Sequence, residues 1–214
     1  MTLGNDGYNM LVIINCGMGN LQSVANAFNA LGCPTQISSR PEDLRGADRI
    51  VLPGVGAFGE GISHLQTAGW VAVLEEEVRQ KSKPFLGICL GMQLLATTGT
   101  EHGTYRGLGW IPGIVERIKS DDPAIRVPHI GWNDVSFTQK GSMYADMGDS
   151  GIFYFVHSYV LRPENSSFIS GLCRYGIEFA ASIETGNIWA TQYHPEKSQK
   201  VGLKVLKNFL NMVR

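Results

Sequence analysis

Apolar residues in the first half of the chain gather in short continuous runs, and longer stretches with a helical period separate these runs. Continuous apolar residues, in contrast to alternating ones, are typical of strands that are covered on both faces, as in a parallel sheet. The pattern therefore predicts buried strands at residues 10–14, 36–38, 49–52 and 85–88.

Two stretches between these runs keep one apolar face at helical spacing. The first face is formed by Leu21, Val24, Ala25, Phe28 and Leu31. Gly32 follows at the position where a helix would end. The second stretch spans about residues 61–79, and Pro84 precedes the next strand. Strands and helices thus alternate along the first half, as in an α/β sheet.

The second half of the chain has short apolar runs at 114–118, 152–156, 179–183 and 188–193. Because no linker separates them from the first half, we expect antiparallel strands added to the same sheet. An apolar stripe over residues 201–213 predicts a final helix docked on the core. We expect one domain over 10–214, an α/β three-layer sandwich with a mixed, mostly parallel central sheet. Residues 1–9 would form a flexible leader.

The composition of the 214 residues is that of a globular chain, with 43% hydrophobic and 17% charged residues. The formal net charge of −1 gives no electrostatic reason for a nucleic-acid or membrane partner. No apolar segment approaches the roughly 20 residues that span a bilayer, and no export signal is recognisable. The four scattered cysteines are then expected to be reduced thiols in a cytoplasmic protein.

The segment Gly87-Ile-Cys89-Leu-Gly91 follows a predicted strand and precedes a run, 92–96, that we expect to be helical. It is the thiol version of the strand-to-helix turn G-x-S-x-G, which holds a nucleophile in a strained backbone geometry. Glycines on both sides would avoid collisions with the neighbouring strand and helix. The helix N-terminus would favour the thiolate. Cys89 is the candidate nucleophile, and a small buried core cysteine is the alternative.

A cysteine nucleophile needs an imidazole base, and that base needs a group to hold its tautomer. Among the five histidines, only His194 has a carboxylate two residues on, that of Glu196 beyond Pro195. A residue before proline favours the extended conformation, in which residues two apart project to the same side. His194 also follows a predicted strand, where open α/β sheets place their sites. We therefore expect Glu196 to orient His194 toward Cys89; a surface turn stiffened by proline is the alternative.

A glycine-rich turn, Pro53-Gly54-Val55-Gly56, follows the strand at 49–52. Acyl transfer requires two backbone N–H groups aimed at the developing oxyanion. We expect one from Leu90, directly after the nucleophile, and the other from this turn, an ordinary glycine turn being the alternative. Gln22 stands where a dinucleotide-binding loop at 17–22 would have its third glycine. With no Walker loop or metal-binding pattern either, we expect no cofactor and no metal.

Together these motifs resemble those of the triad-type (class I) glutamine amidotransferases. The resemblance rests on Cys89 in G-I-C-L-G-M-Q, on His194 and Glu196 in H-P-E-K-S, and on P-G-V-G at 53–56. The segments G-M-G-N-L, P-H-I-G-W-N and F-Y-F-V-H-S-Y further resemble the glutaminase subunits of imidazole glycerol phosphate synthase. The resemblance covers the chain from about residue 10 to its end and implies the flavodoxin-like fold of class I glutaminases.

The resemblance implies that Cys89 attacks the side-chain amide of glutamine and that His194 moves the protons. The positions that it implies for holding glutamine and its oxyanion are Gly54, Val55, Leu90, Gln93, Glu101, His157, Ser158 and Tyr159. Lys197 and Asn15 match the end of the sheet that faces the partner. That partner is a (β/α)₈-barrel cyclase, which forms a heterodimer with the glutaminase. It uses channelled ammonia to make imidazole glycerol phosphate and an aminoimidazole carboxamide ribonucleotide in histidine biosynthesis.

Two departures from the family pattern leave room for a different function. Asn15-Cys16 stands where relatives frequently have Asp-Tyr, and the segment before Met10 is longer than expected. A paralogue that supplies ammonia for the amidation of a surface sugar would fit these departures. The motifs are also compatible with a stand-alone cysteine hydrolase and with a non-catalytic interaction protein. The carboxylate of Glu196 and the P-G-V-G turn favour a glutaminase over the hydrolase, and the presence of all three triad residues disfavours the non-catalytic protein.

Overall fold

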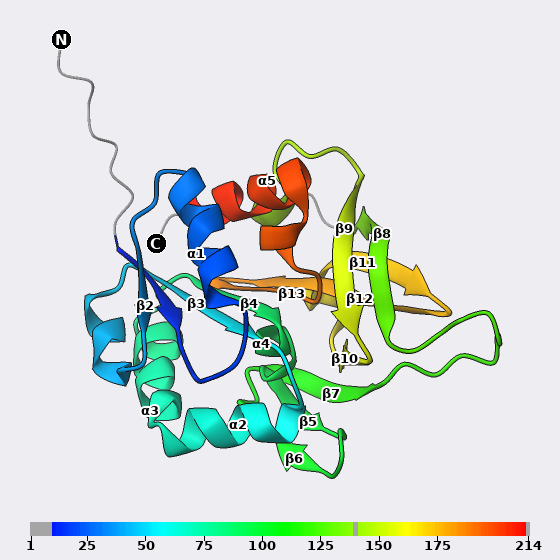
Figure 1. Cartoon of the computed structure of the whole chain (residues 1–214), viewed down its shortest axis with the longest axis horizontal. Coiled ribbons are helices and arrows are strands. Elements are labelled where there is room, and N and C mark those ends of the chain that lie inside the picture. The colour runs from blue at the N-terminus through cyan, green and yellow to red at the C-terminus, as the bar shows by residue number, and fades with distance from the viewer. Residues whose placement is uncertain (1–9, 139–140, 213–214) are drawn as a thin grey trace.

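The computed structural model describes residues 10–138 and 141–212, and a mixed sheet of nine strands runs through this part of the chain (Figure 1). The strand order is β2-β1-β3-β4-β13-β12-β11-β8-β9. Pairings from β2 to β13 are parallel, and those from β13 to β9 are antiparallel. The strands are β1 Leu11–Ile14, β2 Thr35–Ser38, β3 Arg49–Gly54, β4 Phe85–Cys89, β8 His129–Phe137, β9 Ser150–His157, β11 Ile169–Tyr175, β12 Ile177–Thr185 and β13 Ile188–Thr191. The leader expected at 1–9 lies outside the described residues.

Helices cover both faces of this sheet, with α1 and α5 on one face and α2 and α3 on the other (Figure 1). The α-helices are α1 Leu21–Ala30, α2 Phe58–Thr67, α3 Trp70–Leu74, α4 Leu90–Gln93 and α5 Gln199–Leu210. A π-helical segment, η2 Glu75–Gln80, continues α3. The 3₁₀ helices are η1 Pro41–Gly46, η3 Ser142–Tyr144, η4 Ser166–Phe168 and η5 Pro195–Lys197. No helix in the described part of the chain is long and apolar enough to cross a membrane.

The first strand shows why the apolar runs are continuous. Leu11 and Ile13 of β1 pack in the cluster that includes α1 and α5, whereas Val12 and Ile14 pack in the cluster that includes α2 and α3. Both faces of the strand are therefore buried, and each completely buried aliphatic side chain contributes about 1.5–3 kcal/mol. The predicted three-layer α/β/α sandwich is confirmed.

One strand prediction is wrong. The run at 114–118 does not join the central sheet but belongs to β7, in a separate four-stranded sheet of order β10-β7-β5-β6 that lies beside α2 (Figure 1). Its strands are β5 Ala96–Gly99, β6 Tyr105–Arg106, β7 Ile111–Arg117 and β10 Tyr159–Pro163. Burial alternates along β7, with Ile111 and Val115 buried and Ile114 exposed, which is typical of a strand covered on one face.

Two helix predictions also need correction. The stretch expected as one helix over 61–79 is interrupted at Gly69, whose φ of 77° ends α2 and starts α3 in a new direction. The run at 92–96 is not a helix, because α4 ends at Gln93 and β5 begins at Ala96. Thr97 and Thr98 follow Ala96, and their branched side chains favour a strand.

Candidate active site

Cys89 is the last residue of β4 and lies at the sharp turn into α4. Its φ of 55° and ψ of −107° are strained for a residue with a side chain. The flanking glycines make this turn possible, because a Cβ on Gly91 would overlap the carbonyl oxygen of Leu52. A Cβ on Gly87 would lie 2.7 Å from the carbonyl oxygen of Gly91. The strained turn with obligatory glycines that the sequence predicts at Cys89 is therefore present.

The helix after Cys89 is shorter than the sequence suggests. With four residues, α4 is a single turn, so it cannot supply the dipole of a long helix to the thiol. Side-chain and main-chain groups surround the sulfur instead. Nε2 of Gln192 donates to Sγ of Cys89 at 3.6 Å, and the carbonyl oxygen of Val156 lies 4.0 Å from the same sulfur. These polar neighbours hold the sulfur in place, and Cys89 itself is only 6% exposed.

His194 and Glu196 form a buried pair at the carboxyl end of β13. Nδ1 of His194 lies 2.8 Å from Oε1 of Glu196, and the two side chains are 4% and 3% exposed. His194 is extended, with φ −98° and ψ 95°, as its position before proline predicts. Its Nε2 is buried and has no hydrogen-bond partner among the described residues. Burial disfavours the charged ring, but Cys89 and Glu196 outweigh burial and raise the pKa of His194 to about 10.

The glycine-rich turn at the end of β3 lies next to Cys89 and Leu90. Gly54 pairs in parallel register with Cys89, and a Cβ on Gly54 would come within 3.1 Å of the Cβ of Leu90. Val55 follows and is 44% exposed. The two segments expected to supply the oxyanion donors thus lie side by side at one end of the sheet.

A cavity of about 430 Å³ opens beside Cys89. It is lined by Val55, Gly56, Ala57, Cys89, Leu90, Gln93, Glu101, His102, Val156, His157, Ser158 and Tyr159. The structure therefore brings together every residue expected to hold glutamine except Gly54. That glycine lies in a smaller adjoining hollow with His194, Glu196 and Lys197. Within the cavity, Oε2 of Glu101 accepts a hydrogen bond from the backbone N–H of Phe58 at 2.9 Å.

The two residues expected to face a partner have different surroundings. Lys197 is exposed, and its Nζ lies 5.8 Å from the ring centroid of Tyr154. Asn15 closes the turn after β1: its Oδ1 accepts from the N–H of Gly17 at 3.1 Å, and its Nδ2 donates to Ser39 at 3.0 Å. The side chain of Asn15 thus supports the turn itself.

Sequence reasoning missed two residues that support the site. Gln192 is buried and its Oε1 accepts from Nε2 of Gln93 at 3.0 Å, so it links the cavity wall to Cys89. Oγ of Ser198 donates to the carbonyl oxygen of His194 at 2.6 Å and accepts from the N–H of Tyr154 at 3.0 Å. The sequence did contain one sign of Gln192: it is a polar residue within the apolar run at 188–193, just before His194.

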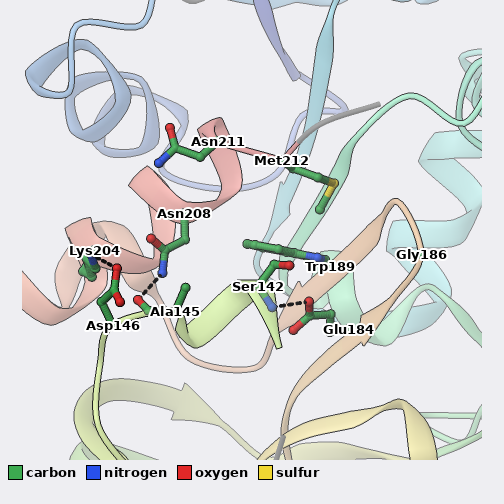
Figure 2. Close-up of a pocket in the computed structure, with 10 residues that line it drawn as sticks. All are labelled: Ser142, Ala145, Asp146, Glu184, Gly186, Trp189, Lys204, Asn208, Asn211 and Met212. Carbon is green, nitrogen blue, oxygen red and sulfur yellow. Dashed lines mark hydrogen bonds and ion pairs between the residues drawn. The ribbon is translucent and has the colours of Figure 1, made fainter. Parts of the chain in front are cut away.

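A second cavity of about 480 Å³ lies at the opposite end of the strands from Cys89, near the turn between β12 and β13 (Figure 2). Several of its polar groups are bonded to one another or to the main chain. Oε1 of Glu184 accepts from the N–H of Ser142 at 2.9 Å, and Nδ2 of Asn208 donates to the carbonyl oxygen of Ala145 at 3.0 Å (Figure 2). Because the described residues around it include no cysteine or histidine, this larger cavity offers no nucleophile or base of that kind.

Comparisons with known proteins show the family and the fold of this chain. Residues 12–213 match the family described as glutamine amidotransferase class-I. The imidazole glycerol phosphate synthase subunit HisH of Moorella thermoacetica is 45% identical over 204 residues, which cover 95% of each chain. The HisH subunit of Geobacter sulfurreducens is 45% identical over 206 residues, covering 94% of this chain and 98% of the relative. PurLQS from Thermotoga maritima shares the fold, with a TM-score of 0.73 at 16% identity, over 95% of this chain and 98% of that chain.

Proposed function

The chain belongs to the glutamine amidotransferase class-I family and within it to the HisH subunits of imidazole glycerol phosphate synthase, and on this premise we propose that it hydrolyses L-glutamine at Cys89. The ammonia passes to a cyclase subunit that makes imidazole glycerol phosphate and the aminoimidazole carboxamide ribonucleotide, so the assembled enzyme is a lyase of histidine biosynthesis. Residues 10–214 act as one amidotransferase domain. The observation that carries the proposal is the buried His194–Glu196 pair beside a strained cysteine at the wall of a cavity.

In the first half of the reaction, the thiolate of Cys89 attacks the side-chain amide carbon of glutamine. The carbonyl oxygen becomes an oxyanion, which the backbone N–H groups of Leu90 and of the turn at Val55 stabilise. Protonated His194, which its raised pKa favours, gives its proton to the departing nitrogen. The C–N bond breaks, ammonia leaves, and a thioester between the γ-carbonyl and Cys89 remains.

In the second half, neutral His194 takes a proton from water as that water attacks the thioester carbon. The C–S bond then breaks, glutamate is released, and Cys89 returns to the thiolate beside protonated His194. Glu196 holds Nδ1–H of the ring throughout, so that Nε2 faces the reacting atoms. Each proton that His194 gives up in the first half is thus recovered in the second.

The cavity wall supplies groups suited to the rest of the glutamine molecule. The carboxylate of Glu101 suits the α-ammonium group, and its position is held by the N–H of Phe58. Gln93 and the main chain of residues 157–159 offer uncharged polar groups elsewhere in the lining of the cavity. We assign glutamine binding to Gly54, Val55, Leu90, Gln93, Glu101, His157, Ser158 and Tyr159.

An exposed apolar face supports docking of the cyclase. Ile130 and Trp132 of β8 and Ile152 of β9 are 61%, 48% and 53% exposed. The Trp132 ring lies 5.9 Å from that of Tyr154, over which Lys197 is placed. Contiguous exposed apolar groups of this kind mark protein–protein interfaces. We refer to Ile130, Trp132, Ile152 and Tyr154 as the docking face.

The docking face adjoins the catalytic segment. Trp132 and Ile152 border a surface hollow together with Ser198, which bonds to the carbonyl oxygen of His194. A partner seated there covers the end of the sheet where ammonia is produced, with Lys197 and Asn15 at its border. The (β/α)₈-barrel cyclase, as a heterodimer partner, is favoured over a sugar-amidating enzyme because the 45% identical relatives are synthase subunits. The four free cysteines fit a cytoplasmic location.

Labelling with a glutamine analogue that carries a reactive carbon in place of the amide tests this proposal. Mass analysis of the cyclase complex is expected to find the adduct on the peptide with Cys89 and none on that with the buried Cys173, the internal control. An unlabelled Cys89 in a chain that cleaves peptides would support a stand-alone hydrolase instead.

A further inference from the structure

Two buried histidines contact each other next to the glutamine cavity, and the reaction described above uses neither ring. His129 of β8 and His157 of β9 are cross-strand partners in antiparallel register. Nδ1 of His129 lies 3.0 Å from Nε2 of His157, and the residues are 2% and 6% exposed. A direct contact between two ring nitrogens requires one of them to donate and the other to accept.

The neighbours of the pair fix which nitrogen donates. Nδ1 of His157 lies 3.0 Å from the carbonyl oxygen of Tyr159, which can only accept, so Nδ1 carries the hydrogen. In a neutral ring, Nε2 of His157 then accepts, and Nδ1 of His129 must donate to it. Nε2 of His129 is left as an acceptor, facing Nδ2 of Asn133 at 3.3 Å.

The amide of Asn133 is itself held in the donating orientation. Its Nδ2 also donates to the carbonyl oxygen of Arg174 at 3.1 Å, and its Oδ1 accepts from the N–H of Asp134 at 2.8 Å. Turning the amide over would lose both bonds. One set of tautomers, with hydrogen on Nδ1 of both neutral rings, therefore satisfies every contact of the pair.

Aromatic rings enclose the pair and favour its neutral form. The His129 ring stacks on Tyr175 at 4.0 Å and on Phe155 at 4.8 Å. The edge of Phe179 approaches His157 at 5.2 Å between ring centroids. Burial accordingly lowers the pKa of His129 to about 4 and that of His157 to about 3.

Beyond Tyr159, the chain of hydrogen bonds continues from the histidine pair to the nucleophile Cys89. The carbonyl oxygen of Tyr159 also accepts from Nε2 of Gln93 at 2.9 Å. The same amide nitrogen donates to Oε1 of Gln192 at 3.0 Å, and Nε2 of Gln192 donates to Sγ of Cys89 at 3.6 Å. The Tyr159 carbonyl is thus a shared acceptor that connects the histidine pair to the two glutamines and the thiol.

We propose that the His129–His157 pair positions the glutaminase site: in its one neutral tautomer it holds the Tyr159 carbonyl, which orients Gln93, and through it Gln192 and the Cys89 thiol. The inference rests on the proposed glutaminase function. His129 is a positioning residue, since it touches neither the cavity nor the thiol and acts through His157. Without the N–H donor of His129, the tautomer of His157 is no longer fixed and the segment at 157–159 is no longer held in place. Small displacements of reacting groups lower a reaction rate by large factors.

Two substitutions of His129 separate its hydrogen bond from its packing. His129→Asn keeps an N–H donor near the Nδ1 position but loses the stacked ring. His129→Phe keeps the ring between Tyr175 and Phe155 but has no donor. The donor role predicts that, in the cyclase complex, His129→Asn retains kcat for glutamine hydrolysis within about threefold, while His129→Phe lowers kcat at least tenfold. A packing role predicts the reverse order. Circular dichroism of each variant chain and its co-elution with the cyclase report intact folding and docking.

The tautomers are measured directly by NMR on the full wild-type chain with ¹⁵N-labelled histidine. The expected result is a protonated Nδ1 and an unprotonated Nε2 on both rings at neutral pH. Hydrogen on Nε2 of His157, or a wild-type kcat in the His129→Phe complex, would overturn the proposal. If neither variant folds, the NMR measurement alone tests the proposal. A wild-type complex that does not hydrolyse glutamine would refute the proposed function instead, whereas the tautomer measurement needs no substrate.

Discussion

Nδ1 of His194 lies 2.8 Å from the carboxylate of Glu196, with both side chains almost wholly buried. This pair forms because Pro195 keeps His194 extended and starts a single 3₁₀ turn, which brings the carboxylate back under the ring. The carboxylate fixes the ring orientation and stabilises its charge, and these two effects can be separated by mutation.

Glu196→Gln is expected to lower kcat for glutamine hydrolysis by about 10- to 1,000-fold, less than the loss of Cys89 or His194. The amide still orients the ring, but it stabilises the imidazolium poorly. The measurement is glutamate release by the cyclase complex, with Cys89→Ala and His194→Ala as references. A Glu196→Gln enzyme that is fully active, or as inactive as Cys89→Ala, would contradict this division of roles.

Gly91→Ala is expected to destabilise the fold by about 3 kcal/mol or more, because the new Cβ overlaps the carbonyl oxygen of Leu52. Gly46→Ala is the matched control, since no atom lies within 4 Å of a Cβ at that position. Urea unfolding of the two variants checks the difference. Equal midpoints for both variants would show that the nucleophile turn tolerates a side chain.

Trp132→Ala is expected to weaken binding of the cyclase at least tenfold, because large exposed aromatic side chains dominate interface energies. Ile37→Ala is the control: Ile37 is 38% exposed but lies on β2, the edge strand opposite β9. Calorimetric titration of each variant with the cyclase gives the affinities. If both variants bind like the wild type, the docking face lies elsewhere.

The buried histidine pair predicts a pH dependence of stability. The folded pKa values of His129 and His157, about 4 and about 3, lie below the usual value near 6.5. Between these values the pair binds more protons in the unfolded chain than in the folded one, so the contribution of the pair to stability is complete above pH 6.5 and falls as the pH drops toward 4. Each histidine contributes a slope of up to about 1.4 kcal/mol per pH unit. Denaturant unfolding at pH 7 and pH 5 is expected to show a smaller loss for His129→Phe than for the wild type.

The sequence is most informative where one local pattern determines the structure. The strands β1, β3 and β4 were predictable because their runs are apolar on both faces, whereas β2, at the edge of the sheet, is buried only at Ser38. The strained turn at Cys89 was predictable because a glycine stands on each side of it. The second sheet was not predictable, because the assignment of β7 depends on pairing with β10 and β5, which follow from the tertiary fold. The interruption of the helix at Gly69 had no sign in the sequence other than a glycine within a helical pattern, which a helix can also contain.

The contacts of the candidate site also fall into two groups, those that a local sequence pattern predicts and those that depend on the tertiary fold. His194 and Glu196 are two residues apart, so their contact follows from local backbone preference. Gln192 meets Cys89 across two strands, and His129 meets His157 across another pair, at separations in sequence that no short motif encodes. The register of the sheet, and not the spacing of residues, creates these contacts.

The central claim, that this chain produces ammonia at Cys89 and the partner consumes it, is tested by supplying the nitrogen in two forms. A complex of the Cys89→Ala chain with its cyclase is expected to make imidazole glycerol phosphate from high ammonium at alkaline pH, where free NH₃ is plentiful, and none from glutamine. A Cys173→Ala complex, which changes a buried cysteine on β11, is expected to use both sources. Glutamine-dependent synthesis by the Cys89→Ala complex, or loss of its ammonium-dependent synthesis while it remains folded, would contradict the claim.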